Sequence, residues 1–173
     1  MTKYVAFLRG INIVKSKRVK MEDLRRAFEN IGFKNVRTVI ASGNVIFETS
    51  SGNEKTLAKR VEKALPDAIG FESATVVVSM DFLRKILEKN PFEKIEFTPD
   101  IKPYVTFTRP DSKNRLKFPL NGIGYTILGY YQGAVFSVID LASCKTPDLM
   151  LVLDKEWPGN TTRGWKTIER ILK

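Results

Sequence analysis

The segment Tyr4-Val5-Ala6-Phe7-Leu8, followed by Arg9-Gly10-Ile11-Asn12, is the most informative part of the sequence for the fold of the N-terminal half of the chain. An unbroken apolar run of this length predicts a central β-strand with both faces covered, because a strand with one face in water would alternate with polar residues. Gly10 and Asn12 then predict a turn at the end of the strand.

The segments after this strand complete one supersecondary unit. Apolar residues three or four positions apart predict helices over 21–31 and 54–65, the second capped by Asn53 and ended by Pro66. Runs of β-prone residues predict strands at 36–40, 45–47 and 74–78, with a turn at Ser42-Gly43-Asn44. The order β-α-β-β-α-β is that of a ferredoxin-like split βαβ unit, which we place at residues 1–79.

Residues 80–173 predict a second α+β subdomain packed on the first. Ser79 precedes a helical pattern over 82–87, residues 104–108 read as a strand, and 125–131 and 134–139 flank a hairpin turn at Gln132-Gly133. A helix is expected from Thr146-Pro147-Asp148 to about residue 157. The partly similar order of elements leaves a diverged ferredoxin-like repeat open. The predicted fold class is therefore α+β with two subdomains.

The composition removes several kinds of chemistry. The chain has no His and one Cys, Cys144, so zinc sites and Ser–His or Cys–His nucleophile pairs are excluded. Asp140, Asp148, Asp154 and Glu156 show no spacing that compels an acid–base pair. We therefore expect no metal and no cofactor, identify no catalytic residue, and leave enzyme activity open.

The charge and hydropathy pattern indicate the environment and the kind of partner. No apolar run approaches the ~20 residues that a membrane-spanning helix needs, and no signal peptide precedes the first strand. We expect a cytoplasmic protein without membrane contact. The formal net charge of +10 and the pI near 9.7 favour anionic partners such as nucleic acid or phosphate-bearing ligands.

One candidate ligand site follows from the predicted sheet. In a ferredoxin-like sheet the first and third strands are neighbours, so the loop after Leu8 lies beside the start of the strand that follows residue 43. The corner would combine Arg9, Gly10, Asn12, Ser42, Gly43 and Asn44, with Lys15, Lys17 and Arg18 just after it. Two interpretations are open: an anion or phosphate cradle, or glycines and asparagines that only shape turns.

A second candidate is Arg163, which follows Thr161 and Thr162. If either threonine caps the last helix, Arg163 lies at a helix N-terminus, where anions are favoured. The alternative is a routine cap with a surface arginine.

Three motifs in this order resemble one bacterial family, catalogued as a domain of unknown function with the number sixteen ninety-seven. They are the segments 7–12 (FLRGIN), 42–44 (SGN) and 161–165 (TTRGW). Family members often carry Gly-Gly where this chain continues with Val14-Lys15, and often Asn where Gly164 stands. The resemblance implies a ferredoxin-like α+β fold elaborated into two linked subdomains, and implies no activity.

Three classes of function remain. The first is binding of an anionic ligand, phosphate-bearing or nucleic acid, through the basic loops at one end of the N-terminal sheet. The second is a protein-interaction module that meets an acidic partner. The third is a small histidine-free enzyme acting on an anionic metabolite. An RNA-binding sheet surface is disfavoured, because the first strand is apolar on both faces.

Overall fold

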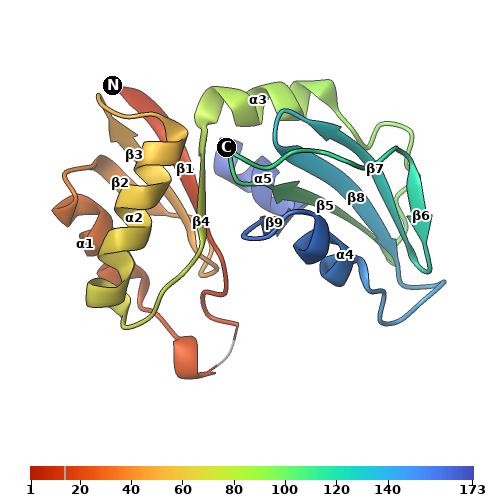
Figure 1. Ribbon diagram of the computed structural model, residues 1–173, viewed down its shortest axis with the longest axis horizontal. Coiled ribbons are helices and arrows are strands. Elements are labelled where there is room, and N and C mark those ends of the chain that lie inside the picture. Colours follow the sequence, from red (N-terminus) through yellow and green to blue (C-terminus); the bar gives the residue numbers. More distant parts are fainter. Residues whose placement is uncertain (14) are drawn as a thin grey trace. The chain divides into compact units, whose positions relative to one another are not determined.

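The computed structural model describes residues 1–13 and 15–173, with the side chain of Lys17 outside the described part. Within these residues the chain is an α+β protein with two antiparallel sheets, of four and five strands, and five α-helices. The chain divides into two compact units (Figure 1). Unit 1 comprises Met1–Arg84 with Leu172, and unit 2 comprises Lys85–Ile171 with Lys173.

Unit 1 follows the order predicted from the sequence. Its elements are β1 (Thr2–Leu8), a short 3-10 turn η1 (Lys15–Lys17), α1 (Met21–Asn30), β2 (Lys34–Thr38), β3 (Asn44–Thr49), α2 (Glu54–Ile69) and β4 (Thr75–Ser79). The strands form one sheet in the order β2-β3-β1-β4, and every neighbouring pair is antiparallel. β1 is therefore central, which is why its sequence is continuously apolar.

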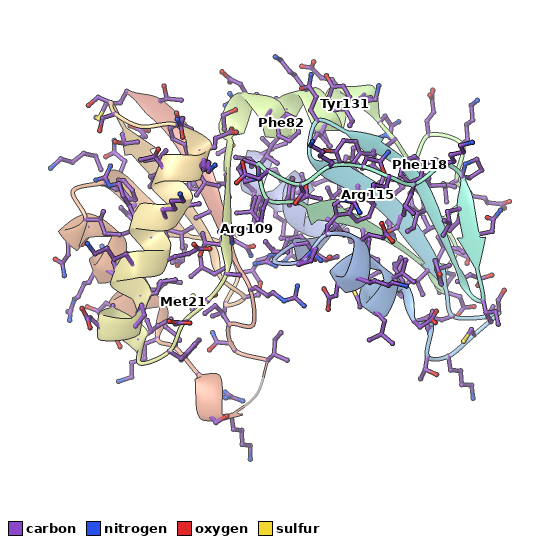
Figure 2. All side chains as sticks on the ribbon, viewed as in Figure 1. Met21, Phe82, Arg109, Arg115, Phe118 and Tyr131 are labelled. Carbon is purple, nitrogen blue, oxygen red and sulfur yellow. The ribbon has the colours of Figure 1, made fainter. Side chains whose placement is uncertain are left out.

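One face of this sheet is covered by α1 and α2. Ala6, Leu8 and Phe47 on the strands share a core with residues of both helices, and Met21 at the first turn of α1 packs at its margin (Figure 2). The Phe33 and Phe47 rings stack with centroids 4.2 Å apart. The side chains that point to the opposite face are also buried: Val5, Phe7, Ile46, Val76 and Val78.

The ends of α2 show one prediction that held and one that failed. Asn53 caps the helix as expected, since its Oδ1 accepts a hydrogen bond from the Thr56 N–H at 2.9 Å. Pro66 does not end the helix, which continues to Ile69 and stops at Gly70 with a φ of 86°. Proline removes one backbone donor, and here a glycine free to adopt positive φ provides the actual stop.

Helix α3 (Met80–Lys89) contains the division between the two units, and Ser79 Oγ accepts from the Phe82 N–H at its start. Unit 2 continues with β5 (Ile101–Phe107), β6 (Leu120–Gly122), β7 (Tyr125–Tyr131), β8 (Ala134–Asp140), α4 (Leu149–Glu156), β9 (Thr161–Gly164) and α5 (Trp165–Leu172). The sheet has the order β6-β7-β8-β5-β9, again antiparallel throughout.

Alternate residues of the second sheet point into two different cores. On one face, Ile127 and Val135 pack with Leu149, Leu153 and Trp157 from α4 and the segment that follows it. Phe118, on the segment between β5 and β6, packs at the margin of this core (Figure 2). On the other face, Phe136 meets Phe92, which in turn contacts Trp165 at the start of α5. Among the described residues, no helix is both long and apolar enough to cross a membrane.

Candidate functional site

The structure brings the two predicted loops together at one end of the sheet in unit 1. Phe7 of β1 lies directly opposite Asn44 of β3, and the Leu8 N–H donates to the Gly43 carbonyl at 2.8 Å. The segments Arg9–Asn12 and Ser42–Asn44 are therefore adjacent, although about thirty residues separate them in the sequence.

The two glycines of this corner serve the backbone in different ways. Both have a φ that other residues rarely adopt, 75° at Gly10 and 81° at Gly43. A Cβ at position 10 would meet no atom within 4 Å, whereas one at position 43 would lie 3.0 Å from the Ile11 Cγ1 and 3.1 Å from the Leu8 Cβ. Gly43 thus allows the two loops to approach closely, while Gly10 only allows a turn.

Asn12 uses its side chain to hold the first loop in shape. Its Oδ1 accepts a hydrogen bond from the Val19 N–H at 2.7 Å, and its Nδ2 donates to the Val19 and Ala41 carbonyls at 3.3 and 2.9 Å. The residue itself has a φ of 59°, a conformation that Asn tolerates better than most residues. This side chain therefore closes the loop between residues 12 and 19 and ties it to the neighbouring loop.

Asn44 and Ser42 are likewise engaged within the protein. Asn44 is fully buried, and its Nδ2 donates to the Val39 carbonyl at 2.9 Å and to the Ser42 Oγ at 3.1 Å. Both carboxamides of the corner therefore fix backbone geometry, which is the second interpretation left open by the sequence.

Several basic side chains of this corner are exposed to solvent. Residues 9–20 include five lysines and arginines and no acidic residue. Arg9, Lys15, Arg18 and Lys20 are exposed, and Lys15, Arg18 and Lys20 form no ion pair with the residues that the structure describes. Lys17, a predicted site residue, has its side chain outside the described part. In Figure 1 the turn η1 within this segment lies beyond the end of the sheet.

The sequence had suggested that Arg163 lies at the N-terminus of the last helix, capped by a threonine. In the structure it lies instead in the strand that precedes this helix. Thr161 to Gly164 form strand β9, and the helix begins at Trp165 with Gly164 as its N-cap. The threonines are drawn into the sheet by pairing with β5, where the Thr106 and Thr162 hydroxyls are 2.8 Å apart. Arg163 Nη1 donates to the Thr161 Oγ1 and the Thr162 carbonyl, both at 3.0 Å. Burial lowers the pKa of its guanidinium to about 10, so it remains charged at neutral pH.

Other reactive groups do not assemble into a site within the described residues. No cluster of three His, Cys, Asp or Glu residues that could hold a metal is found there. The Asp140 carboxylate accepts hydrogen bonds from the Ser143 hydroxyl and the Ala142 N–H in the turn that follows it. These hydrogen bonds lower the pKa of its carboxyl. Cys144 is half-buried.

Unit 2 contains a cleft that the sequence did not predict. It lies at the start of β5, between the turn after α3 and the start of α5, and its lining includes Phe97, Tyr104 and Trp165. Two sequence features signal it in retrospect. Phe97 is an aromatic residue between the polar residues Glu96 and Thr98, and Pro103 interrupts a strand, which is typical of an unpaired strand edge.

Comparison with known proteins confirms the family resemblance seen in the sequence, and it finds a solved structure with a similar fold over both units. The family described as "Protein of unknown function (DUF1697)" matches residues 1–118, which include the first two motifs. The conserved bacterial protein SP0830 from Streptococcus pneumoniae has a similar solved structure, with a TM-score of 0.74 and 21% sequence identity. The match covers 99% of this chain and 96% of that protein, so it includes both units. No curated protein matches the chain.

Proposed function

The chain belongs to the DUF1697 family, and we propose that this member binds the phosphates of single-stranded nucleic acid through residues 9–20, which we call the basic loop. Phosphate contacts of this kind come from exposed Lys and Arg side chains and need no base recognition.

The observation that supports the proposal most is a loop of one sign of charge held in a defined shape. Asn12 forms hydrogen bonds with Val19 at the far end of the loop and with Ala41 of the neighbouring loop, so Lys15 and Arg18 lie between two points that are hydrogen-bonded to each other. Lysines and arginines crowded without acidic neighbours repel one another, and an anionic ligand relieves that repulsion. Lys15, Arg18 and Lys20 are exposed and form no ion pair with the described residues, so no carboxylate of that part of the chain neutralises them by direct contact.

The sheet itself favours phosphate contacts over base stacking. RNA-binding sheets stack bases on exposed aromatic side chains of their central strands. Here Phe7 is fully buried on one face, and on the other Tyr4 and Phe47 stack on each other at 5.8 Å under the helices. Binding is therefore expected to be largely independent of base sequence.

The experiment is a titration of a fluorescently labelled single-stranded RNA at low salt, read by anisotropy. It compares the wild type with Lys15→Ala/Arg18→Ala and with the control Lys59→Ala/Lys63→Ala, which removes two exposed charges from α2 of the same unit. We expect the loop variant to bind about tenfold or more weakly at ~50 mM salt, and the control to bind nearly as the wild type does. Equal weakening in both variants would show that binding depends on the net charge, and would reject the proposal that the basic loop is the binding site.

We also infer that unit 1 is a ferredoxin-like domain and unit 2 a diverged copy of it. The strands β7, β8, β5 and β9 are arranged as β2, β3, β1 and β4 are, with antiparallel pairs throughout, and α4 corresponds in chain order to α2. In place of α1, unit 2 has the segment that carries β6. The two domains would then correspond to residues 1–79 and 80–173, with α3 as the connection.

A further inference from the structure

A cleft of about 620 Å³ lies in unit 2 where strand β9 ends beside β5. Sites for small molecules typically have volumes of roughly 300–1,000 Å³. The cleft is formed by three segments that are distant in sequence: the turn after α3, the first half of β5 and the start of α5.

The cleft exists because β9 is shorter than β5. Pairing between them runs from Phe107 opposite Thr161 to Tyr104 opposite Gly164, and the chain then turns into α5 at Trp165. Within the part of the chain that the structure describes, the first half of β5, residues 101–103, is paired with β8 alone. One edge of that segment therefore borders the cleft.

This edge is a poor template for a further strand. Thr108 donates its N–H to Gly133 on the β8 side, so by alternation the Lys102 N–H also faces β8. The Ile101 N–H is bonded to the Thr98 carbonyl, and Pro103 has no N–H. Strand addition needs alternating donors and acceptors, and residues 101–103 offer no donor to a new strand.

The walls of the cleft suit a flat apolar group instead. Phe97 is 56% exposed, which is unusual for a phenylalanine, and Ile101 and Pro103 add aliphatic surface. Trp165 is fixed in place by an edge-to-face contact with Phe92 at 5.1 Å. An aromatic wall whose position is already determined loses little conformational entropy on binding.

The charges around the cleft favour an acid as the ligand. Lys102 and Lys166 line it, are exposed, and form no ion pair with other described residues. Glu169 is the one acidic residue among the lining residues, so the charge of the lining is positive overall.

We propose that this cleft binds a small organic carboxylate, with its flat apolar body between Phe97 and Trp165 and its carboxylate close to Lys102 and Lys166. The site belongs to unit 2 and is independent of the nucleic-acid binding proposed for the basic loop.

The test uses 1-naphthoate as the probe and 1-naphthalenemethanol as its uncharged analogue. Binding is followed by the backbone amide chemical shifts of the full-length protein. We expect saturable binding of naphthoate with a dissociation constant of about 1 mM, and shifts centred on Ile101, Lys102 and Trp165. Phe97→Ala should weaken the binding of both compounds by about fivefold or more. The unfolding temperature of the Phe97→Ala variant should differ little from that of the wild type, because the Phe97 side chain is largely exposed.

The lysines are tested with Lys102→Ala/Lys166→Ala against the control Lys145→Ala/Lys155→Ala, which removes two exposed charges elsewhere in unit 2. The first variant should lose naphthoate affinity by about fivefold and keep its affinity for the alcohol, while the control keeps both. The proposal is overturned by an absence of saturable binding, by shifts centred elsewhere, or by equal effects of the two double variants.

Discussion

The side-chain Oδ1 of Asn12 accepts a hydrogen bond from the backbone N–H of Val19 at 2.7 Å, seven residues later in the chain. The same side chain donates to the Ala41 carbonyl of the neighbouring loop. One side chain thus joins residues 12 and 19 of the basic loop and attaches them to the neighbouring loop of unit 1.

Replacing Asn12 should therefore destabilise the protein more than the replacement of an exposed polar residue normally does. Asn12→Ala removes these hydrogen bonds and puts alanine, which tolerates positive φ less well than asparagine, at a φ of 59°, and we expect a loss of about 1–3 kcal/mol in the free energy of unfolding. Asn12→Gly removes the same bonds without the conformational strain, so it should be less harmful. Urea unfolding of both variants measures the difference. Wild-type stability in Asn12→Ala would show that the bonds contribute nothing.

Gly43 and Gly10 form a matched pair for separating strain from packing. Each alanine substitution introduces a positive-φ penalty of about 1–2 kcal/mol, but only the Cβ at position 43 would press against Ile11 and Leu8. Gly43→Ala should therefore cost about 1–3 kcal/mol more than Gly10→Ala. Denaturant midpoints of the two variants provide the comparison, and equal midpoints would contradict the close contact between the loops.

Asp140 and Ser143 provide a test of the local electrostatics in unit 2. The Ser143 hydroxyl donates to the Asp140 Oδ2 at 2.6 Å and is the main reason that the pKa of this carboxyl is lowered, with smaller contributions from the Ala142 and Ser143 N–H groups. Ser143→Ala should raise the pKa of Asp140 toward its ordinary value, as measured by the carboxyl chemical shift during an acid titration. Ser112→Ala, in another loop of the same unit, should leave it unchanged.

The sign of the stability effect follows from the direction of this shift. A carboxyl with a lowered pKa in the folded state binds protons less readily than in the unfolded state, so it stabilises the protein above the unfolded pKa of about 3.9. That contribution is lost as the pH falls through the folded-state pKa. Ser143→Ala should make the loss of stability in acid smaller, and an unchanged acid profile would indicate that the hydroxyl has no such effect.

Local sequence was sufficient where one turn or one periodic face determines an element. Gln132 and Gly133 have φ values of 47° and 90°, as a tight hairpin requires, and the strands on either side begin and end close to their predicted limits. The central position of β1 was also predictable locally, because its continuous apolar run requires a strand that is covered on both faces.

Elements that depend on distant partners were harder to predict. Thr161 and Thr162 are equally suited to capping a helix and to forming a strand, and pairing with β5 decides between the two. The position of the corner in unit 1 was predictable from strand order, but the roles of Asn12 and Asn44 were not, because their bonding partners lie in loops without a regular pattern. The cleft depends on where β9 ends, which no local signal specifies.

The salt dependence of RNA binding tests the central proposal most directly. The logarithm of the association constant, plotted against the logarithm of salt concentration, gives a slope of about −0.7 for each phosphate neutralised on a single strand. If the basic loop binds phosphates, Lys15→Ala/Arg18→Ala should reduce the magnitude of the slope by up to about 1.4, whereas Lys59→Ala/Lys63→Ala should leave it unchanged. A slope that is the same in all three proteins, or no binding at low salt, would contradict a phosphate-binding role for the basic loop.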